Sequence, residues 1–218
     1  MYEEEPWPLP TEASWDFAEA YCPESDAIIT ARQRAAELNV GSVSPAAGAS
    51  LRMIAAMTHA KNIVEIGTGT GVTALWMLQA LRADGQLTSI DMEGEHHRIA
   101  REMLADADVP QGRVRLIAGR PAEILPRLQD GAYDVVLLNV EPSALNPMLD
   151  LSLRLLRPGG IFAVSGIFGG NRLGDPAQRD PATVARRLFA HRFADEPHLM
   201  PAMIPAGDGL LVGVYRPE

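Results

Sequence analysis

The chain has 218 residues, of which 47% are hydrophobic, and this combination suits one α/β domain with a full core and excludes a disordered chain. A formal net charge of -9 disfavours nucleic acid or an anionic membrane as a partner, because like charges repel. Cys22 is the single cysteine, so an internal disulfide is impossible.

The N-terminal segment is acidic and rich in proline, and residues 1–12 are predicted to form a flexible tail. This segment has neither the basic nor the apolar region of a secretory signal. No apolar run in the chain approaches the ~20 residues that are needed to span a bilayer. A cytoplasmic protein is therefore expected.

Two helical segments are predicted before the first strand. Residues 14–38 favour a helix in which Pro23 marks a break or kink. A loop over residues 39–45 follows. Pro45 suits the first turn of a second helix, which is predicted over residues 46–59.

From residue 61 the pattern changes to short apolar runs that alternate with amphipathic segments. Runs of four or five apolar residues flanked by helices indicate parallel strands that are buried on both faces. Repeated β-α-β units with right-handed crossovers wind such strands into an open sheet. The strands are predicted over residues 62–66, 86–90, 114–118, 135–138 and 161–164. The helices between them are predicted over residues 72–81, 94–107, 121–128 and 145–156.

The C-terminal part of the chain breaks this alternation. A helix is predicted from Asp180 to about residue 193, and strands are predicted over residues 198–204 and 210–215. A Gly-rich loop joins these two strands, which predicts a hairpin and an antiparallel last strand.

The elements together predict an α/β fold with a mostly parallel seven-stranded sheet, an antiparallel C-terminal hairpin strand and helices on both faces. A single domain is predicted over residues 13–218. Its N-terminal helices occupy residues 13–59, and its core occupies residues 60–218.

Three glycines at alternate positions, Gly67, Gly69 and Gly71, separate the first predicted strand from a helix. Glycines at such a corner allow a tight turn and let a ligand press against bare backbone, next to the amides and the positive dipole end of a helix. A dinucleotide site requires the spacing G-x-G-x-x-G, but here Val72 stands where its third glycine belongs. The observed spacing, with Glu65 two residues before it, fits S-adenosylmethionine better, with the amides facing its methionine carboxylate. An ordinary strand-turn-helix corner is the alternative.

Asp91 ends the second predicted strand, where an acid can accept hydrogen bonds from both ribose hydroxyls of such a ligand. The alternative role is an N-cap of the helix that follows, and the two roles are compatible. By its position after the third strand, the segment 119–122 is expected beside the adenine.

Four segments occur in a specific pattern and order: Ser44-Pro45-Ala-Ala-Gly48, Val64-Glu-Ile-Gly-Thr-Gly-Thr-Gly71, Leu155-Leu-Arg-Pro-Gly-Gly160 and Gly207-Asp-Gly-Leu210. Through them, the chain from Gly41 to the C-terminus resembles the cation-dependent O-methyltransferase family. This family includes catechol and caffeoyl-CoA O-methyltransferases and many bacterial relatives. The resemblance implies a Rossmann-like class I methyltransferase fold, S-adenosylmethionine as methyl donor and S-adenosylhomocysteine as product.

The resemblance also implies residues that line the donor pocket. By position in the family these are Gly41, Ser42, Val43, Glu65, Gly67, Thr73, Asp91 and Ala122. With the glycine loop and its neighbours, the full predicted set is Gly41, Ser42, Val43, Glu65, Gly67, Thr68, Gly69, Gly71, Thr73, Asp91, Met92, Gly119, Arg120, Ala122 and Asn139.

The chain departs from the family at the metal ligands and at the base. In the family the fourth strand ends in an aspartate ligand followed by a lysine base, and the fifth strand ends in Asp-Asn. Here the corresponding residues are Asn139, Pro142 and the pair Ser165-Gly166. A hard divalent cation prefers carboxylate oxygens, and proline cannot accept a proton. The sequence therefore predicts no metal and no lysine base.

Few other residues are candidates for the missing chemistry. Glu141 is a candidate for a base or a lone carboxylate ligand, with a solvated loop acid as the favoured alternative. Asn139 is the other catalytic candidate. His96 and His97 are expected at the surface, because consecutive helical residues point about 100° apart and suit no shared metal. The loop over residues 166–181 is either a substrate lid or a plain connector.

Three functions follow from these observations. The first is an O-methyltransferase that uses S-adenosylmethionine without a metal and acts on a small molecule, since positioning of the reactants can supply much of the catalysis. The second is a catalytically silent relative that binds the donor or its product and acts through protein contacts. The third, a nicotinamide dehydrogenase, is disfavoured by Val72 and by the C-terminal hairpin. A homodimer is expected, with the helix over residues 14–38 packed across the subunit boundary.

Overall fold

The computed structural model describes residues 10–217, so most of the predicted N-terminal tail lies outside the described part. The first helix, α1, spans Glu12–Ala20 and therefore begins within the predicted tail. The Thr11 side chain caps it by accepting a hydrogen bond from the backbone N–H of Ser14 at 3.3 Å.

The helical segment predicted over residues 14–38 is broken at Pro23 into two helices, and a break was one of the two outcomes expected at that residue. α1 is followed by α2 over Asp26–Glu37, and residues 21–25 connect them. Pro23 lacks a backbone N–H, and the side chain of Ser25 starts α2 by accepting from the N–H of Ile28. The next helix, α3, spans Pro45–Met57 with Pro45 in its first turn, as predicted.

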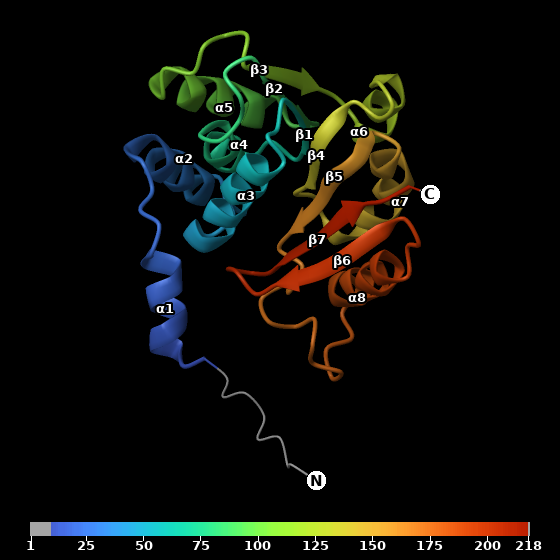
Figure 1. Ribbon diagram of the computed structural model, residues 1–218. Coiled ribbons are helices and arrows are strands. Elements are labelled where there is room, and N and C mark those ends of the chain that lie inside the picture. Colours follow the sequence, from blue (N-terminus) through green and yellow to red (C-terminus); the bar gives the residue numbers. More distant parts are fainter. Residues whose placement is uncertain (1–9, 218) are drawn as a thin grey trace.

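The sheet has seven strands in the order β3-β2-β1-β4-β5-β7-β6. The strands from β1 to β5 pair in parallel, whereas β7 pairs antiparallel with both β5 and β6 (Figure 1). The predicted α/β fold with an antiparallel C-terminal hairpin strand is confirmed. The strands are β1 Asn62–Ile66, β2 Gln86–Asp91, β3 Val114–Ala118, β4 Tyr133–Leu138, β5 Leu156–Ser165, β6 Leu199–Ile204 and β7 Leu210–Tyr215. The remaining helices are α4 Val72–Leu78, α5 Gly94–Asp106, α6 Pro121–Ile124, the 3-10 helix η1 Leu125–Arg127, α7 Pro142–Leu153 and α8 Pro181–Ala194.

The boundary between α7 and β5 differs from the prediction. The helix expected over residues 145–156 begins at Pro142 and ends at Leu153, because β5 begins at Leu156. Pro142 occupies the first turn, where its missing N–H costs no intrahelical hydrogen bond. β5 is consequently longer than the strand predicted over residues 161–164.

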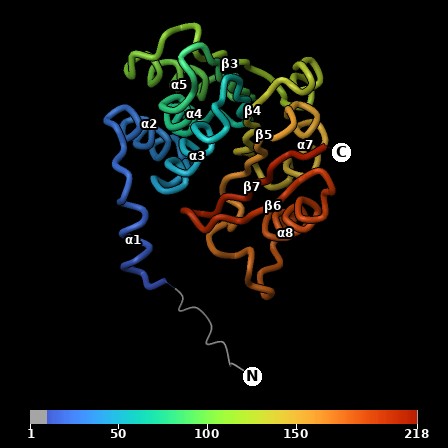
Figure 2. Tube along the Cα trace, viewed as in Figure 1, coloured from blue at the N-terminus to red at the C-terminus, as the bar shows by residue number. Residues whose placement is uncertain are grey.

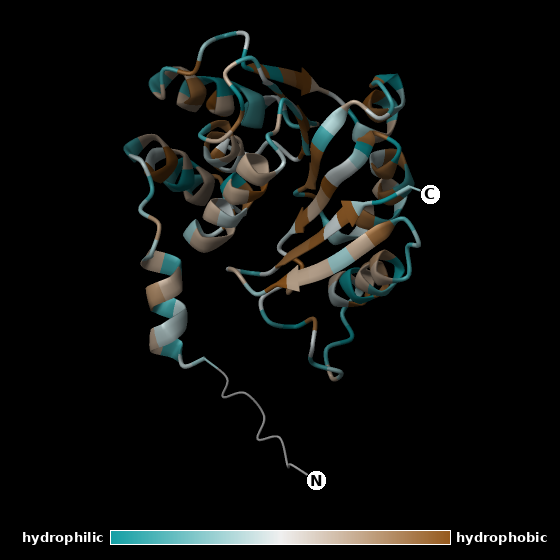
Figure 3. Cartoon of the chain, viewed as in Figure 1, coloured by the Kyte–Doolittle hydropathy of each residue, from teal (hydrophilic) through white to brown (hydrophobic). Residues whose placement is uncertain are grey.

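Strand side chains alternate between two hydrophobic clusters, one on each face of the sheet. Val135 and Leu137 belong to the cluster under α2, α3, α4 and α5, whereas Val136 and Leu138 belong to the cluster under α7 and α8. Both faces are therefore covered by helices, as Figures 1 and 3 show, with hydrophobic strands at the centre. Within residues 10–217, no helix is both long enough and apolar enough to cross a bilayer.

α1 differs from the other long helices because none of its residues is buried. Its trace stands apart from the sheet in Figure 2, and it packs on the body beside α3. Trp15, Phe17 and Tyr21 are 39%, 70% and 72% exposed.

Candidate functional site

The site lies at the carboxyl ends of the central parallel strands. β1 stands between β2 and β4, so the chain leaves β1 and β4 toward opposite sides of the sheet. Ligands of open α/β sheets bind at such a switch point. Backbone hydrogen bonds join the strand ends there: the N–H of Gly67 donates to Ile90 O and the N–H of Asn139 donates to Ile66 O, both at 2.8 Å.

Two cavities open at this edge of the sheet. One, which we name the Gly-loop cavity, has a volume of about 500 Å³ and lies between the glycine loop, Asp91 and the start of α7. The other, the Ser165 cavity, has a volume of about 550 Å³ and lies between the ends of β4 and β5, the segment before α3 and the β6–β7 hairpin. Gly41, Asn139 and Val140 line both cavities, which are therefore adjacent.

Many of the residues predicted to bind the donor line the Gly-loop cavity. These are Gly41, Gly67, Gly69, Asp91, Met92, Arg120, Ala122 and Asn139. Pro121, from the segment expected beside the adenine, also lines it. The cavity is completed by residues outside the predicted set: Val40, Ile66, Ile90, His96, Val140, Glu141, Ala144 and Met148. Most of these are apolar residues in ordinary positions, which carry no motif signal.

The other predicted residues lie elsewhere. Ser42 and Val43 line the Ser165 cavity. Glu65, Thr68 and Thr73 are buried. Gly71 and Gly119 do not line the Gly-loop cavity either.

The glycines of the loop have different roles. Gly67, Gly69 and Gly71 all have positive φ angles, of 95°, 50° and 91°. A Cβ on Gly67 would lie 1.9 Å from the carbonyl oxygen of Asn139, so Gly67 allows β1 and β4 to meet. A Cβ on Gly69 would meet only Val40, at 3.5 Å, on the side of the Gly-loop cavity.

The amides of these glycines bond within the protein, which differs from the expectation that they face a ligand. The N–H of Gly69 donates to Asp91 Oδ2 at 3.1 Å, and the N–H of Gly71 donates to Thr68 O at 3.0 Å. Asp91 thus fixes the loop from the neighbouring strand.

Asp91 collects three hydrogen bonds at the rim of the Gly-loop cavity. Its Oδ1 accepts from the N–H of Glu93 at 2.9 Å, and its Oδ2 contacts His96 Nδ1 at 3.1 Å in addition to Gly69. Partial burial acts to raise the pKa of Asp91, but these hydrogen bonds outweigh it and hold the pKa below its ordinary value. Asp91 is therefore a carboxylate that both supports the start of α5 and faces the cavity.

The two histidines of α5 have different surroundings. His96 lines the Gly-loop cavity beside Asp91. His97 is only 5% exposed, and its Nε2 contacts Thr68 Oγ1 at 3.4 Å. The expectation that both are surface residues is therefore wrong for His97, because it faces the glycine loop rather than solvent. Burial lowers the pKa of His97.

Glu65 lies beneath the glycine loop as a buried carboxyl. Its Oε2 accepts from Ser89 Oγ at 2.7 Å, and its Oε1 has no hydrogen-bond partner among residues 10–217. Burial raises the pKa of Glu65 from 4.5 to about 8, and the charge of Asp91 acts in the same direction. Glu65 is therefore neutral over most of the physiological pH range.

A Glu65→Gln variant tests this protonation state. Between pH 4.5 and about 8 the unfolded chain ionises Glu65 whereas the folded chain keeps it neutral, so the free energy of unfolding of the parent falls over that range. The variant lacks this loss. We expect its stability relative to the parent to rise with pH and to level off above pH 8, by roughly 3–5 kcal/mol in total.

Urea denaturation of both proteins from pH 4.5 to 9 measures the effect. Glu95→Gln is the control and should show no such rise, because the hydrogen bond with Arg98 lowers the pKa of Glu95 rather than raising it. A stability difference that stays constant with pH would show that Glu65 keeps an ordinary pKa.

Two polar side chains meet at the wall of the Ser165 cavity. Ser165 Oγ donates to Asn139 Oδ1 at 2.9 Å, and both residues line this cavity together with Gly166. The positions that hold metal ligands in the family therefore carry one amide, one hydroxyl and, at Gly166, no side chain. Residues 10–217 hold no group of three or more His, Cys, Asp or Glu side chains that could bind a metal ion. These neutral groups do not fit a hard divalent cation.

The structure also places Glu141 and the loop over residues 166–181, which follows β5. Glu141 is exposed, lines the Gly-loop cavity and precedes α7 without making a capping hydrogen bond. The loop is tied down at several points: Arg186 Nε donates to Gly166 O at 3.1 Å, and the N–H of Gly170 donates to Asp208 Oδ1 at 2.8 Å. These bonds favour the connector interpretation over a lid.

Comparison with known proteins identifies the family of the chain. The family described as O-methyltransferase matches residues 18–215. A Mycobacteroides abscessus protein that carries a provisional O-methyltransferase name is 43% identical over 202 residues, which cover 93% of this chain and 94% of the relative.

Solved structures share this fold. A Corynebacterium glutamicum protein superposes with a TM-score of 0.85 at 27% identity, covering 93% of this chain and 95% of that one. The O-methyltransferase TomG from Streptomyces achromogenes, solved with S-adenosylmethionine, superposes with a TM-score of 0.83 at 25% identity, covering 96% and 100% of the two chains.

Proposed function

The chain belongs to the O-methyltransferase family, and on that premise we propose that the Gly-loop cavity binds S-adenosylmethionine and the Ser165 cavity binds the methyl acceptor. The protein is an S-adenosylmethionine-dependent O-methyltransferase, and the catalytically silent alternative is not favoured. The observation that carries the proposal is that Gly41, Asn139 and Val140 line both cavities. The donor and the acceptor would therefore lie next to each other at these three residues, as transfer of a methyl group between them requires.

The residues of the chain supply binding and orientation. When bound, S-adenosylmethionine supplies an electrophilic methyl group on a sulfonium. The carboxylate of Asp91 accepts hydrogen bonds from hydroxyls at the rim, and the bare backbone at Gly69 allows close approach. Asn139 and Ser165 orient the acceptor hydroxyl, since both line the Ser165 cavity with polar side chains. Holding two reactants in line is itself a large source of rate enhancement.

We propose that this transfer needs no divalent metal. Support comes from the chemistry of the donor set, in which Asn139 Oδ1 already accepts from Ser165 Oγ and Gly166 offers no ligand. Magnesium requires one or two carboxylates to stay bound. Glu141 is the acid nearest to Asn139 in the sequence, but it lines the Gly-loop cavity rather than the Ser165 cavity.

Calorimetry tests the donor and the metal together. We expect S-adenosylmethionine and S-adenosylhomocysteine to bind with the same affinity in magnesium and in excess chelator, and NAD not to bind. Methyl transfer should also persist in chelator. Asn139→Asp alone should not create a magnesium dependence, because the second carboxylate is still missing. Transfer that stops in chelator would overturn metal independence and would point to Asp208 or Glu24 as a ligand, since these are the carboxylates that line the Ser165 cavity.

We also propose that the protein is a homodimer that uses α1. Support comes from the exposed aromatic side chains of α1 and from Met53 and Met57, which are 53% and 72% exposed on α3, the helix that α1 contacts. Large exposed apolar patches are characteristic of interfaces. We expect light scattering to give twice the chain mass, and Phe17→Asp to give the monomer mass. Leu188→Asp, at an exposed apolar position on α8, is the control and should leave the dimer intact.

The remaining expectations complete the proposal. Residues 13–218 act as one domain, supported by α2 and α3 sharing a hydrophobic cluster with strand residues. The acceptor is a small molecule, in keeping with the volume of the Ser165 cavity. Nucleic acid and membranes are not partners, supported by the net charge of -9, and the protein acts in the cytoplasm.

A further inference from the structure

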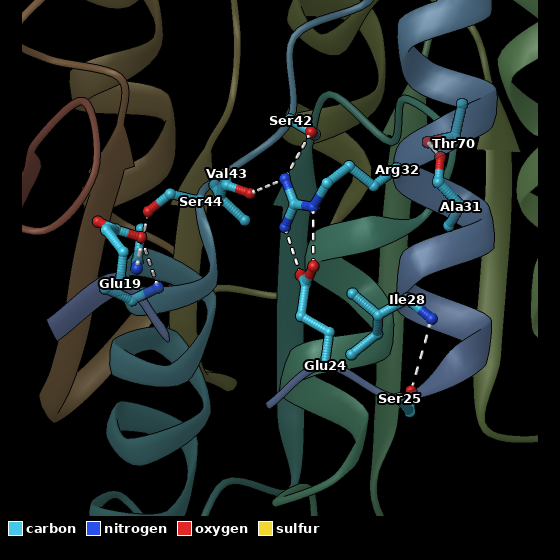
Figure 4. Close-up of polar contacts among 12 residues, drawn as sticks. Glu19, Glu24, Ser25, Ile28, Ala31, Arg32, Ser42, Val43, Ser44 and Thr70 are labelled. Atoms are coloured by element: carbon cyan, nitrogen blue, oxygen red, sulfur yellow. Dashed lines mark hydrogen bonds and ion pairs between the residues drawn. The ribbon is translucent and has the colours of Figure 1, made fainter. Parts of the chain in front are cut away.

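Arg32 connects three parts of the chain through one guanidinium group. From α2, its Nε donates to Glu24 Oε2 at 3.0 Å and its Nη2 donates to Glu24 Oε1. Its Nη1 donates to Ser42 Oγ at 2.9 Å and to Val43 O at 2.5 Å. Figure 4 shows the side chain reaching from the helix to Glu24, Ser42 and Val43. Arg32 thus joins the α1–α2 connection to the α2–α3 connection.

The segment that Arg32 holds forms part of both cavities. Residues 40–44 form no helix or strand, and the Arg32 side chain donates to one of their backbone carbonyls, that of Val43. Val40 and Gly41 line the Gly-loop cavity, and Gly41, Ser42 and Val43 line the Ser165 cavity. A shift of this segment would therefore change the walls of both ligand sites.

A second contact links α2 to the glycine loop. Thr70 Oγ1 donates to Ala31 O at 2.7 Å, and Thr70 is 2% exposed (Figure 4). Ala31 precedes Arg32 in α2. The same turn of the helix therefore bonds to the glycine loop on one side and to residues 42–43 on the other.

The Glu24–Arg32 pair also contributes to the charge of the Ser165 cavity, whose lining includes one further residue of each sign, Arg186 and Asp208. Both members of the pair line it, and their side chains are only 11% and 27% exposed. Together they are neutral. Removal of either partner would leave the opposite charge uncompensated beside the acceptor.

We propose that Arg32 is a positioning residue for methyl transfer, which fixes residues 40–44 between the two ligands, and that its pairing with Glu24 determines which acceptor charge is tolerated. The proposal rests on the assignment of the two cavities to donor and acceptor. It concerns a residue outside the glycine loop and outside the Asn139–Ser165 pair.

The test compares four variants of the full chain: Arg32→Met, Arg32→Lys, Glu24→Gln and Arg34→Met. Arg34 is the matched control, since it lies in the same helix and pairs with exposed Glu37 at 2.9 Å away from both cavities. Initial rates of S-adenosylhomocysteine formation are measured with three catechols that carry a carboxylate, no charge or an ammonium group. Amide hydrogen exchange of residues 39–44 is measured on the same proteins.

Arg32→Met should lower kcat/KM by roughly 10- to 100-fold, as expected for misplaced reactants, and should speed exchange at residues 39–44. Its preference should shift by about tenfold against the anionic catechol, whereas Glu24→Gln should shift it by about tenfold toward that catechol. Arg32→Lys keeps the charge but loses the planar fork, so it should restore the charge preference and not the rate. A purely structural role would not give opposite shifts.

Equal preferences in Arg32→Met and Glu24→Gln, or exchange at residues 39–44 that matches Arg34→Met, would overturn the proposal. If the parent methylates none of the catechols and does not bind S-adenosylmethionine, the assignment of the cavities fails. The exchange measurement still decides whether Arg32 holds the segment. If Arg32→Met does not fold, Arg32→Lys and Glu24→Gln carry both readouts.

Discussion

Gly69→Val should abolish binding of S-adenosylmethionine while the protein remains folded. The Cβ of residue 69 would meet only Val40 at 3.5 Å, so the protein interior can accept it. The two added methyl groups would extend on the side of the Gly-loop cavity and occupy the space of the ligand. We expect affinity to fall by more than about 100-fold, which corresponds to roughly 3 kcal/mol or more. Calorimetry with the donor measures this loss.

Gly131→Val is the matched control for backbone strain. Gly131 has a φ of 63°, close to the 50° of Gly69, and a Cβ there would have no neighbour within 4 Å. Both variants should lose a similar free energy of unfolding, about 1–2 kcal/mol, because each forces a branched side chain into the left-handed region. Only Gly69→Val should lose the ligand. Normal donor binding by a folded Gly69→Val protein would remove the glycine loop from the donor site.

Gly67→Ala should be the most destabilising single methyl addition in the loop. The new Cβ would lie 1.9 Å from the carbonyl oxygen of Asn139. This oxygen belongs to the backbone, so it cannot move aside by a change of rotamer as a side-chain atom could. The residue also has a φ of 95°. Strain and overpacking together should lower the free energy of unfolding by roughly 2–5 kcal/mol. Urea denaturation gives the value, and loss of soluble protein would be the extreme result.

Gly71→Ala separates the steric clash from the strain. Gly71 lies in the same loop with a φ of 91°, but its Cβ would meet Ala100 at an ordinary 3.5 Å. It should therefore cost only the strain, about 1–2 kcal/mol. Equal costs at both positions would mean that the ends of β1 and β4 can move apart, and that Gly67 is not what lets them meet.

The sequence predicted best those elements that depend on local residue patterns. The strands over residues 62–66 and 114–118 have the predicted bounds, because runs of buried apolar residues between turn residues are a local signal. The hairpin after Ile204 follows from its Gly-rich loop in the same way. Helix ends were less well predicted where a competing neighbour decided them, as at Leu153, where β5 starts three residues later.

The sequence alone therefore determined the order of the elements, the fold and the family, through the spacing of Gly67, Gly69 and Gly71 and the residues at the strand ends. Only the tertiary structure decided which residues line the same cavity, because this depends on the pairing of strands that are far apart in the chain. Gly67 faces Asn139 because β1 pairs with β4, and Arg32 reaches Ser42 because α2 folds back over the segment before α3. The protonation of Glu65 was likewise decided by burial, since a carboxyl acquires its pKa from its surroundings and not from its neighbours in sequence.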